Sequence, residues 1–232
     1  MIGERVSIRA GNLPILLVAP HGFDADDERT GIITEYIANT IDCYAVINNG
    51  WERDETVDFM KDKADCNNVI HCHEDVVREE ILEPIIKYKD KILQTYENMY
   101  LFYIHGMSNK HKKISGDPNL DAVIGFGAGS PNSFTCDPWR KDLFIHLLDD
   151  VGLHAYEGSK GGPMSGWART NMNQLFRKWY PEPAVHSMQI EIVHELREAN
   201  DIALITAEYM GIVMKDMLKT RSFTAKNQTK AY

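Results

Sequence analysis

A histidine and an aspartate three positions apart lie directly after an apolar run of the sequence. His21 follows ILLVAP (15–20), and Asp24 comes after it with Gly22 between them. On a turn that follows a strand, side chains three residues apart can point at one atom, and imidazole and carboxylate groups are both zinc ligands. The same spacing would arise if Asp24 capped a turn and His21 formed local hydrogen bonds. The pair indicates a candidate metal site that needs further ligands.

A second histidine supplies a third ligand for this candidate site. His105 follows MYLFYI (99–104), a run typical of a strand, and Gly106 comes next. Two histidines and one carboxylate form a common catalytic zinc set, in which one coordination position stays open for water. The alternative is an ordinary polar histidine at the end of a strand. We predict one divalent ion, zinc, as the cofactor.

One carboxylate lies inside an apolar run. Glu191 belongs to SMQIEIVHEL (187–196), which has the composition of a buried strand. Because an unpaired buried carboxylate is costly, ionisable residues in such places are candidate catalytic groups. A glutamate beside a metal-activated water could act as a general base. If the strand is half exposed, Gln189 and Glu191 instead share the solvent face of an alternating pattern.

Two arginines and two asparagines are candidates for binding a substrate. Arg53 comes shortly after a predicted strand, and an arginine can hold a carboxylate through two parallel hydrogen bonds. Asn67 or Asn68 could add amide donors. Arg169 ends a glycine-rich loop (159–170) that would let the backbone approach a ligand. The alternatives are a surface ion pair for Arg53 and an ordinary surface loop.

Strand-like apolar runs alternate with helical patterns along the chain, and this order predicts one α/β domain. We expect a mixed, mostly parallel central sheet with helices on both faces, and ligands at the carboxyl ends of its strands. The catalytic domain is expected over residues 1–222, with a polar tail over residues 223–232. The predicted strands are 15–20, 43–48, 99–104, 122–127, 153–158 and 185–193, and the predicted helices are 30–41, 76–96, 139–151, 169–180 and 200–219.

Three local features of the helices follow from residue types. Asp26 or Asp27 is available to cap the helix that begins at Thr30. Pro84 should kink or split the helix in which it lies. The packed face of the last helix is expected to be Ile202, Ile205, Tyr209, Ile212 and Val213.

Composition excludes several classes of function. The formal net charge of −9 argues against nucleic-acid binding, which needs a basic face. No run of about 18 apolar residues occurs, so we expect neither a transmembrane helix nor a membrane partner. The first residues lack the pattern of a signal peptide, and the four cysteines form no CxxC motif. We therefore predict a cytoplasmic protein with reduced thiols. The oligomeric state stays open.

Other motifs in the sequence do not make convincing sites. Cys66 and Cys72 beside His71 and His73 could bind a metal, but no second ligand pair has a suitable spacing. HELRE (194–198) lacks the second histidine of an H-E-x-x-H zinc helix. No G-x-S-x-G motif occurs, which removes the usual α/β-hydrolase serine.

Taken in chain order, the candidate residues resemble the N-formylglutamate amidohydrolase family. The more specific pieces are PHG after a strand, the D-x-N segment, GGPMSGW and MQIEI, within a similarity that spans about Pro14 to Glu198. The resemblance implies a zinc-carboxypeptidase-like (phosphorylase/hydrolase-like) fold. The order of the matching residues is His21-x-x-Asp24, Arg53, Asp65-x-Asn67, His105, the glycine-rich loop and Gln189-x-Glu191.

The resemblance also implies roles and a reaction. Glu191 would be the general base, and the reaction would be zinc-dependent hydrolysis of an amide bond in a small carboxylate-bearing substrate. The alternatives are a metallopeptidase or amidase of γ-glutamyl or cell-wall peptides, and a non-catalytic binding protein on the same fold. The implied zinc ligands are His21, Asp24 and His105. The implied substrate-binding residues are Arg53, Asn67 and Arg169.

The sequence departs from the family pattern in two places. Asn68 stands where the D-x-N segment usually continues with arginine, so one cationic partner for a substrate carboxylate is missing. Asp24 stands where the wider superfamily often has glutamate, and Asp26 and Asp27 lie close enough to be rival ligands.

Overall fold

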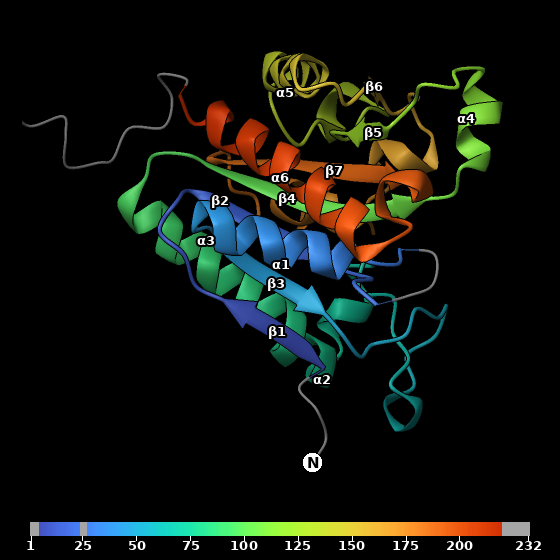
Figure 1. The fold of residues 1–232 in the computed structure, drawn as a ribbon. Coiled ribbons are helices and arrows are strands. Elements are labelled where there is room, and N and C mark those ends of the chain that lie inside the picture. Colours follow the sequence, from blue (N-terminus) through green and yellow to red (C-terminus); the bar gives the residue numbers. More distant parts are fainter. Residues whose placement is uncertain (1–4, 24–26, 220–232) are drawn as a thin grey trace, which may run out of the picture.

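The central element of the fold is a twisted sheet (Figure 1). The structure is a computed structural model that describes residues 5–23 and 27–219. In this part of the chain, seven strands pair in the order β1-β3-β2-β4-β7-β5-β6. The strands are β1 (Val6–Arg9), β2 (Ile15–Ala19), β3 (Tyr44–Asn48), β4 (Met99–Met107), β5 (Ala122–Gly125), β6 (Ala155–Glu157) and β7 (Val185–Val193).

The sheet is mixed, as predicted. β3, β2, β4 and β7 run parallel to one another, and β5 runs parallel to β6. β1 is antiparallel to β3, and β5 is antiparallel to β7. Every residue of β2 and β3 is buried, because parallel strands at the centre of such a sheet are covered on both faces.

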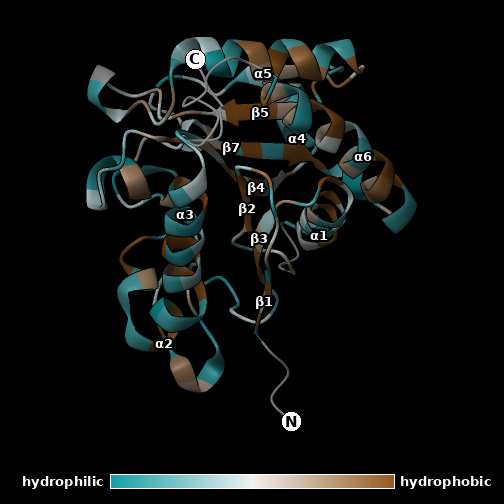
Figure 2. Ribbon diagram, turned by 90° about the vertical axis from the view of Figure 1, so that its left-hand side faces the viewer, coloured by the Kyte–Doolittle hydropathy of each residue, from teal (hydrophilic) through white to brown (hydrophobic). Residues whose placement is uncertain are grey.

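Helices cover both faces of the sheet (Figure 2), which confirms the predicted layers. α1 (Thr30–Ile41), α5 (Pro138–Asp150) and α6 (Asn200–Met217) pack on the face that carries Ile15 and Leu17. α2 (Asp75–Val77) and α3 (Glu83–Thr95) cover the opposite face. A short helix, α4 (Lys110–Ser115), follows β4.

Two predicted helices differ in the structure. Pro84 does split the long helix: a π-helical turn over Arg78–Leu82 precedes α3, and Pro84 lies in the first turn of α3. The predicted helix over residues 169–180 is only partly confirmed, since helical structure begins at Met172 and is not of the α type. Its place is taken by a 3₁₀ turn over Met172–Gln174 and a π-helical turn over Leu175–Trp179.

The start of α1 corrects a further prediction. The helix begins at Thr30 as expected, but its capping residue is Arg29, in the left-handed region with φ of 67°, and no side chain caps the helix. Asp27 contributes only its carbonyl oxygen, which accepts a hydrogen bond from the Thr30 amide at 3.0 Å. The Asp27 carboxylate is therefore available for other contacts. Asp24 and Asp26 lie outside the described residues.

The packed face of α6 is also not the predicted one. Ile205, Tyr209 and Ile212 are exposed by 56%, 42% and 47%, while Val213 is buried as expected. Helix α1 lies close against α6, and at such a short distance small side chains fit where isoleucine does not. The buried positions are Ala203, Thr206, Ala207, Met210, Gly211, Val213, Met214 and Met217.

No described helix has both the length and the apolar character needed to span a lipid bilayer. The four cysteines are buried and form no disulfide.

Candidate metal centre

Three buried side chains meet at the carboxyl ends of β2 and β4. His21 lies two residues beyond β2, and Asp27 lies just before α1. His105 lies inside β4, two residues before its end, and not after the strand as predicted. Each offers one ligand atom, and these atoms lie within 4.8 Å of one another. Within residues 5–23 and 27–219, this is the group of histidine, cysteine and acidic side chains that could hold a metal ion.

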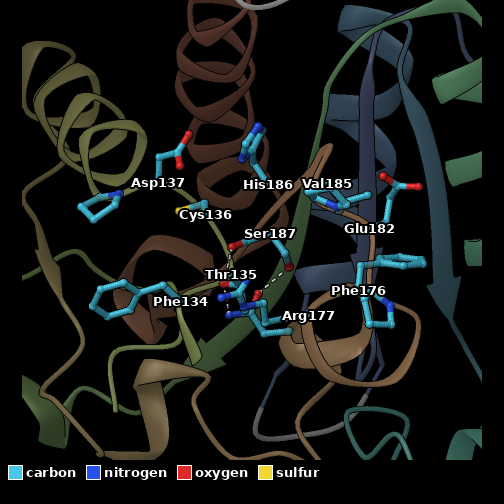
Figure 3. Close-up of a pocket in the computed structure, with 14 residues that line it drawn as sticks. Phe134, Thr135, Cys136, Asp137, Phe176, Arg177, Glu182, Val185, His186 and Ser187 are labelled. Carbon is cyan, nitrogen blue, oxygen red and sulfur yellow. Dashed lines mark hydrogen bonds between the residues drawn. The ribbon is translucent and has the colours of Figure 1, made fainter. Parts of the chain in front are cut away.

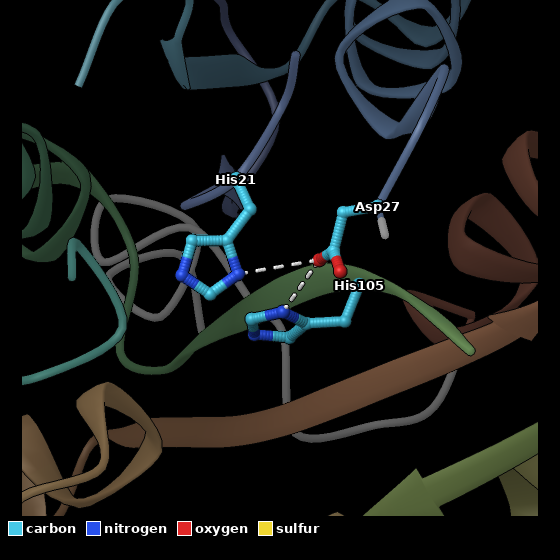
Figure 4. A group of neighbouring side chains, drawn as sticks. All are labelled: His21, Asp27 and His105. Carbon is cyan, nitrogen blue, oxygen red and sulfur yellow. Dashed lines mark hydrogen bonds and ion pairs between the residues drawn. The ribbon is translucent and has the colours of Figure 1, made fainter. Parts of the chain in front are cut away.

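The Asp27 carboxylate bridges the two histidines (Figure 4). Its Oδ2 atom lies 3.0 Å from His105 Nδ1 and 3.4 Å from His21 Nδ1. The two imidazole rings are 5.3 Å apart in an edge-to-face arrangement. All three side chains are at most 5% exposed, so the site lies beneath the surface.

The charges of this cluster are strongly coupled. Burial alone would raise the pKa of Asp27, but the hydrogen bonds and charges of His105 and His21 hold it well below its usual range. Burial would lower the pKa of His21, yet hydrogen bonds with Asp27 and Asp65 raise it to about 9. Asp27 is thus an ionised acceptor, which is the state in which a carboxylate binds a cation.

Asp65 holds the other nitrogen of His21. Its Oδ1 atom lies 2.9 Å from His21 Nε2 and also accepts a hydrogen bond from the Asn67 amide at 2.9 Å. In the metal-free protein, a pKa of about 9 keeps both nitrogens of His21 protonated at neutral pH. In the neutral imidazole that binds a metal, Nε2 would donate to Asp65 and the lone pair would be on Nδ1, the nitrogen that faces Asp27. Carboxylates commonly orient metal-binding histidines in this way.

The buried histidines carry polar atoms that the protein leaves unpaired. Among the described residues, His21 Nδ1 and His105 Nε2 are buried without a hydrogen-bond partner. His21 Nδ1 faces the Asp27 carboxylate, whereas His105 Nε2 is the ring nitrogen that does not contact Asp27. Buried polar atoms normally have partners, and an unpartnered imidazole nitrogen beside a carboxylate, as at His21, is the kind of donor that a divalent metal satisfies.

Glu191 lies beside the cluster because of the sheet register. β4 and β7 are parallel, and His105 pairs directly with Glu191. Residues paired in this way point to the same face of the sheet. Glu191 is half-buried, and burial raises the pKa of its carboxyl. The prediction of a buried strand is confirmed, and the alternative of a solvent face shared with Gln189 is wrong, because Gln189 is buried and Glu191 alone in β7 is partly exposed.

Two amide side chains hold the Glu191 carboxylate. Gln189 Nε2 donates to Glu191 Oε1 at 3.0 Å, and Asn171 Nδ2 donates to Gln189 Oε1 at 3.1 Å. Gln189 lies two residues earlier in β7 and therefore on the same face. The sequence does not predict this chain of hydrogen bonds, because the Q-x-E pattern alone shows no partner for Gln189.

A cavity of about 530 Å³ opens over Glu191. Its lining includes the cationic side chains of Arg53 and Arg197 together with His111 and His194. Arg53 also lines a neighbouring hollow of about 380 Å³ with Asp65 and His71. Arg53 thus lies between Asp65 and Glu191.

The other predicted substrate-binding residues differ in their contacts. Asn67 is next to the Asp65–His21 pair, and its buried Oδ1 atom has no hydrogen-bond partner among the described residues. Asn68 uses its Oδ1 atom to accept from the Ile70 amide. Arg169 is exposed, and its guanidinium lies over the Trp179 ring, 5.4 Å from the centroid.

A second hollow, of about 360 Å³, lies at the amino end of β7, away from Glu191 (Figure 3). Its buried polar groups satisfy one another: Ser187 donates to Asn173, which donates to Thr135 at 3.1 Å. Burial raises the pKa of the Cys136 thiol, so this cysteine stays protonated, and burial lowers the pKa of His186 to about 4. The hollow lacks the convergent ligands of the first site.

Comparisons with known proteins identify similar folds. No family model matches the sequence, and no curated protein does. The crystal structure of N-formylglutamate amidohydrolase from Ralstonia eutropha is similar with a TM-score of 0.64 and 14% identity, covering 94% of this chain and 99% of that chain. A bacteriophage poly-gamma-glutamate hydrolase has a TM-score of 0.54 and 12% identity, covering 94% and 89%. A Burkholderia mallei protein assigned as a carboxypeptidase has a TM-score of 0.53 and 10% identity, covering 92% and 59%.

At these identities the likeness is one of fold. The chain has the α/β fold that amidohydrolase and carboxypeptidase-like structures share, which confirms the predicted fold class. The neighbours are described as hydrolases, whereas the substrate and the metal of this chain have to be argued from its own residues.

Proposed function

We propose that this chain is a metal-dependent hydrolase that cleaves an amide C–N bond in a small carboxylate-bearing substrate, with zinc as its cofactor. The observation that carries the proposal is the convergence of His21, Asp27 and His105 with Glu191 at one edge of the sheet. The neighbouring folds, which belong to hydrolases of amide bonds, support it.

The residues present fit a catalytic zinc site. His21, Asp27 and His105 would hold the ion, and two histidines with one carboxylate form a ligand set that leaves a position open for substrate or water. Asp27 is proposed in place of Asp24 because its carboxylate contacts both histidines. When bound, zinc supplies a Lewis acid that polarises a carbonyl and lowers the pKa of water.

Glu191 would carry the proton during the reaction. The pKa of Glu191 is raised toward neutral pH, so its carboxyl group can both accept and release a proton more readily. Glu191 would accept a proton from the attacking water and deliver it to the leaving nitrogen, so that the C–N bond breaks into a carboxylate and an amine. Gln189 would hold the carboxylate in place for both transfers.

Arg53 and Asn67 would bind the substrate. Arg53 is the cation at the open side of the cavity and could pair with a substrate carboxylate or with negative charge that develops at the carbonyl oxygen. Asn67 lies beside the Asp65–His21 pair. Arg169, which lies over Trp179, would contact only a substrate that extends beyond the cavity.

Metal analysis combined with substrate assays tests the proposal. Purified protein should contain about one zinc ion per chain, and His21→Ala and His105→Ala should lose it. His146→Ala is the matched control, because His146 is exposed on α5. If both site variants retain stoichiometric zinc, the ligand assignment is wrong.

Glu191→Gln separates an enzyme from a binding protein. The variant should retain zinc and lose roughly two or more orders of magnitude in the rate of amide hydrolysis, which is the usual contribution of a general base. Candidate substrates are N-formylglutamate and γ-glutamyl peptides. An unchanged rate would contradict the role of Glu191, and no turnover by the wild type on any amide substrate would favour a binding protein.

γ-Glutamyl peptides are the second candidate substrate class. Arg53 lines two adjoining hollows, and together these offer more room than a single small acid requires. A similar fold also belongs to a poly-gamma-glutamate hydrolase. Comparison of kcat/KM for N-formylglutamate and for γ-glutamyl oligomers of increasing length decides between the two classes.

A further inference from the structure

A buried arginine lies against the backbone segments that carry the site residues. Arg197 is 1% exposed and ends the 3₁₀ turn His194–Arg197, directly after β7. Burial of a guanidinium group is costly unless its N–H groups are paired. Its position in HELRE gives no hint of this burial, because the segment reads as a charged surface turn.

The Arg197 guanidinium donates to backbone carbonyls of three separate segments. Nη1 donates to the Glu28 oxygen at 2.8 Å, Nε to the Ile192 oxygen at 3.2 Å and Nη2 to the Met107 oxygen at 3.3 Å. Glu28 follows Asp27, Ile192 follows Glu191, and Met107 lies two residues after His105. Each segment therefore carries one residue of the proposed site.

The strand is shaped to receive this guanidinium. A Cβ atom at Gly106 would lie 2.3 Å from Arg197 Cζ, which is far inside van der Waals contact. Glycine at this position lets the guanidinium lie against the backbone of β4 directly beside His105. The backbone of Arg197 is held as well, because Arg29 Nη1 donates to the Arg197 carbonyl oxygen at 3.2 Å.

We infer that Arg197 is a positioning residue that fixes the segments of Asp27, His105 and Glu191 relative to one another, and so sets the geometry of the metal ligands and the base. The inference rests on the proposed function. Arginine suits this task because its planar group directs N–H bonds in several fixed directions, whereas a lysine ammonium is a single point charge.

Zinc affinity and the visible spectrum of the cobalt-substituted protein test this role. Arg197→Lys keeps the positive charge and removes the planar donor group. We expect a roughly 10- to 100-fold weaker zinc affinity by chelator competition, which is the effect of losing an outer partner of a metal site. The cobalt spectrum, which reports ligand geometry, should change as well. Gly106→Ala displaces the same guanidinium and should have the same two effects.

Arg140→Lys is the matched control. Arg140 is also buried, at 4% exposed, but it lies on α5 and contacts Asp137 and Tyr100 instead of the site segments. This variant should lower the thermal unfolding temperature without changing the zinc affinity or the cobalt spectrum.

The outcomes separate this inference from the proposed function. If the wild type binds zinc stoichiometrically and the Arg197→Lys and Gly106→Ala variants bind it with unchanged affinity and spectrum, the positioning role is wrong. If Arg140→Lys weakens zinc binding equally, or if both site variants fail to fold, Arg197 acts on the fold as a whole and the inference is overturned. If the wild type binds no zinc, it is the proposed metal site that fails.

Discussion

The contacts of single side chains decide which atoms of the site are free to bind a metal. His21 has one nitrogen held by Asp65 and the other directed at Asp27. In Asp65→Asn, the carboxylate that accepts the Nε2 proton of His21 is replaced by an amide. The amide can present either its oxygen as an acceptor or its NH₂ group as a donor. We expect a roughly tenfold loss of zinc affinity, measured by chelator competition. Asp54→Asn, at a carboxylate that accepts hydrogen bonds from the amide and hydroxyl of Thr56, should leave the affinity unchanged.

The hydrogen bond from Gln189 to Glu191 should affect turnover more than binding. Gln189→Met removes a donor to a charged acceptor, a bond worth about 1.5–3 kcal/mol. We expect kcat to fall by about tenfold or more while KM and the zinc content stay the same. A change in KM with kcat unaffected would show instead that Gln189 contacts the substrate.

The pKa of His21 leads to a pH dependence of stability in the metal-free protein. Burial lowers this pKa, but hydrogen bonds with Asp27 and Asp65 raise it to about 9, above its value in an unfolded chain. The stabilisation is therefore complete below about pH 6.5 and is lost as the pH rises through about 9. Urea unfolding of EDTA-treated protein should show a decrease of at most about 3 kcal/mol across this range. His21→Gln should abolish most of it, and an equal decrease in this variant would contradict the assignment.

Residue types predicted His21, His105 and Glu191 because each one ends or interrupts an apolar run. They did not single out Asp27. Four acidic residues lie between positions 24 and 28, and residue types alone do not tell that the carboxylate of Asp27 contacts the histidines. Arg197 escaped prediction for a related reason, since its partners are backbone carbonyls that no side-chain pattern reveals.

At the scale of elements, buried strands are easier to predict from the sequence than exposed ones. β2, β3 and β7 are almost entirely buried, and their positions were predicted to within a residue or two. β1 was not predicted, because its four residues, VSIR, include an exposed serine and isoleucine and resemble a loop. Its extended structure depends on pairing with the edge of β3. The predicted face of α6 failed because large apolar residues were assumed to be buried.

The packing of α6 on α1 gives a prediction about stability. Ala207→Leu would place a large side chain where α1 approaches closely, and overpacking of this kind costs about 1–3 kcal/mol. Ile205→Ala, at an exposed position of the same helix, should change the free energy of unfolding by less than about 0.5 kcal/mol. Urea denaturation of both variants measures the difference. Equal effects would indicate that the exposed face of α6 is covered in solution.

At the scale of the whole molecule, the proposed metal would connect three separate parts of the chain. An ion bound only by the folded state stabilises it by ~2.7 kcal/mol at a concentration of a hundred times Kd. For a chain of this size, that corresponds to an increase in Tm of roughly 5–10 °C. Addition of zinc to EDTA-treated wild type should therefore raise Tm, and the same addition to His105→Ala should not. An equal increase in the variant would place the zinc elsewhere.

The parallel register of β4 and β7 also constrains how the protein folds. His105 and Glu191 face each other only after a crossover of more than seventy residues, including β5, α5 and β6, has been closed. A slip of one residue would turn Glu191 to the opposite face of the sheet. Such long-range strand pairing is among the slow steps of folding. During synthesis, therefore, His21 and His105 emerge well before Glu191, and the proposed site can assemble only after β7 has paired with β4.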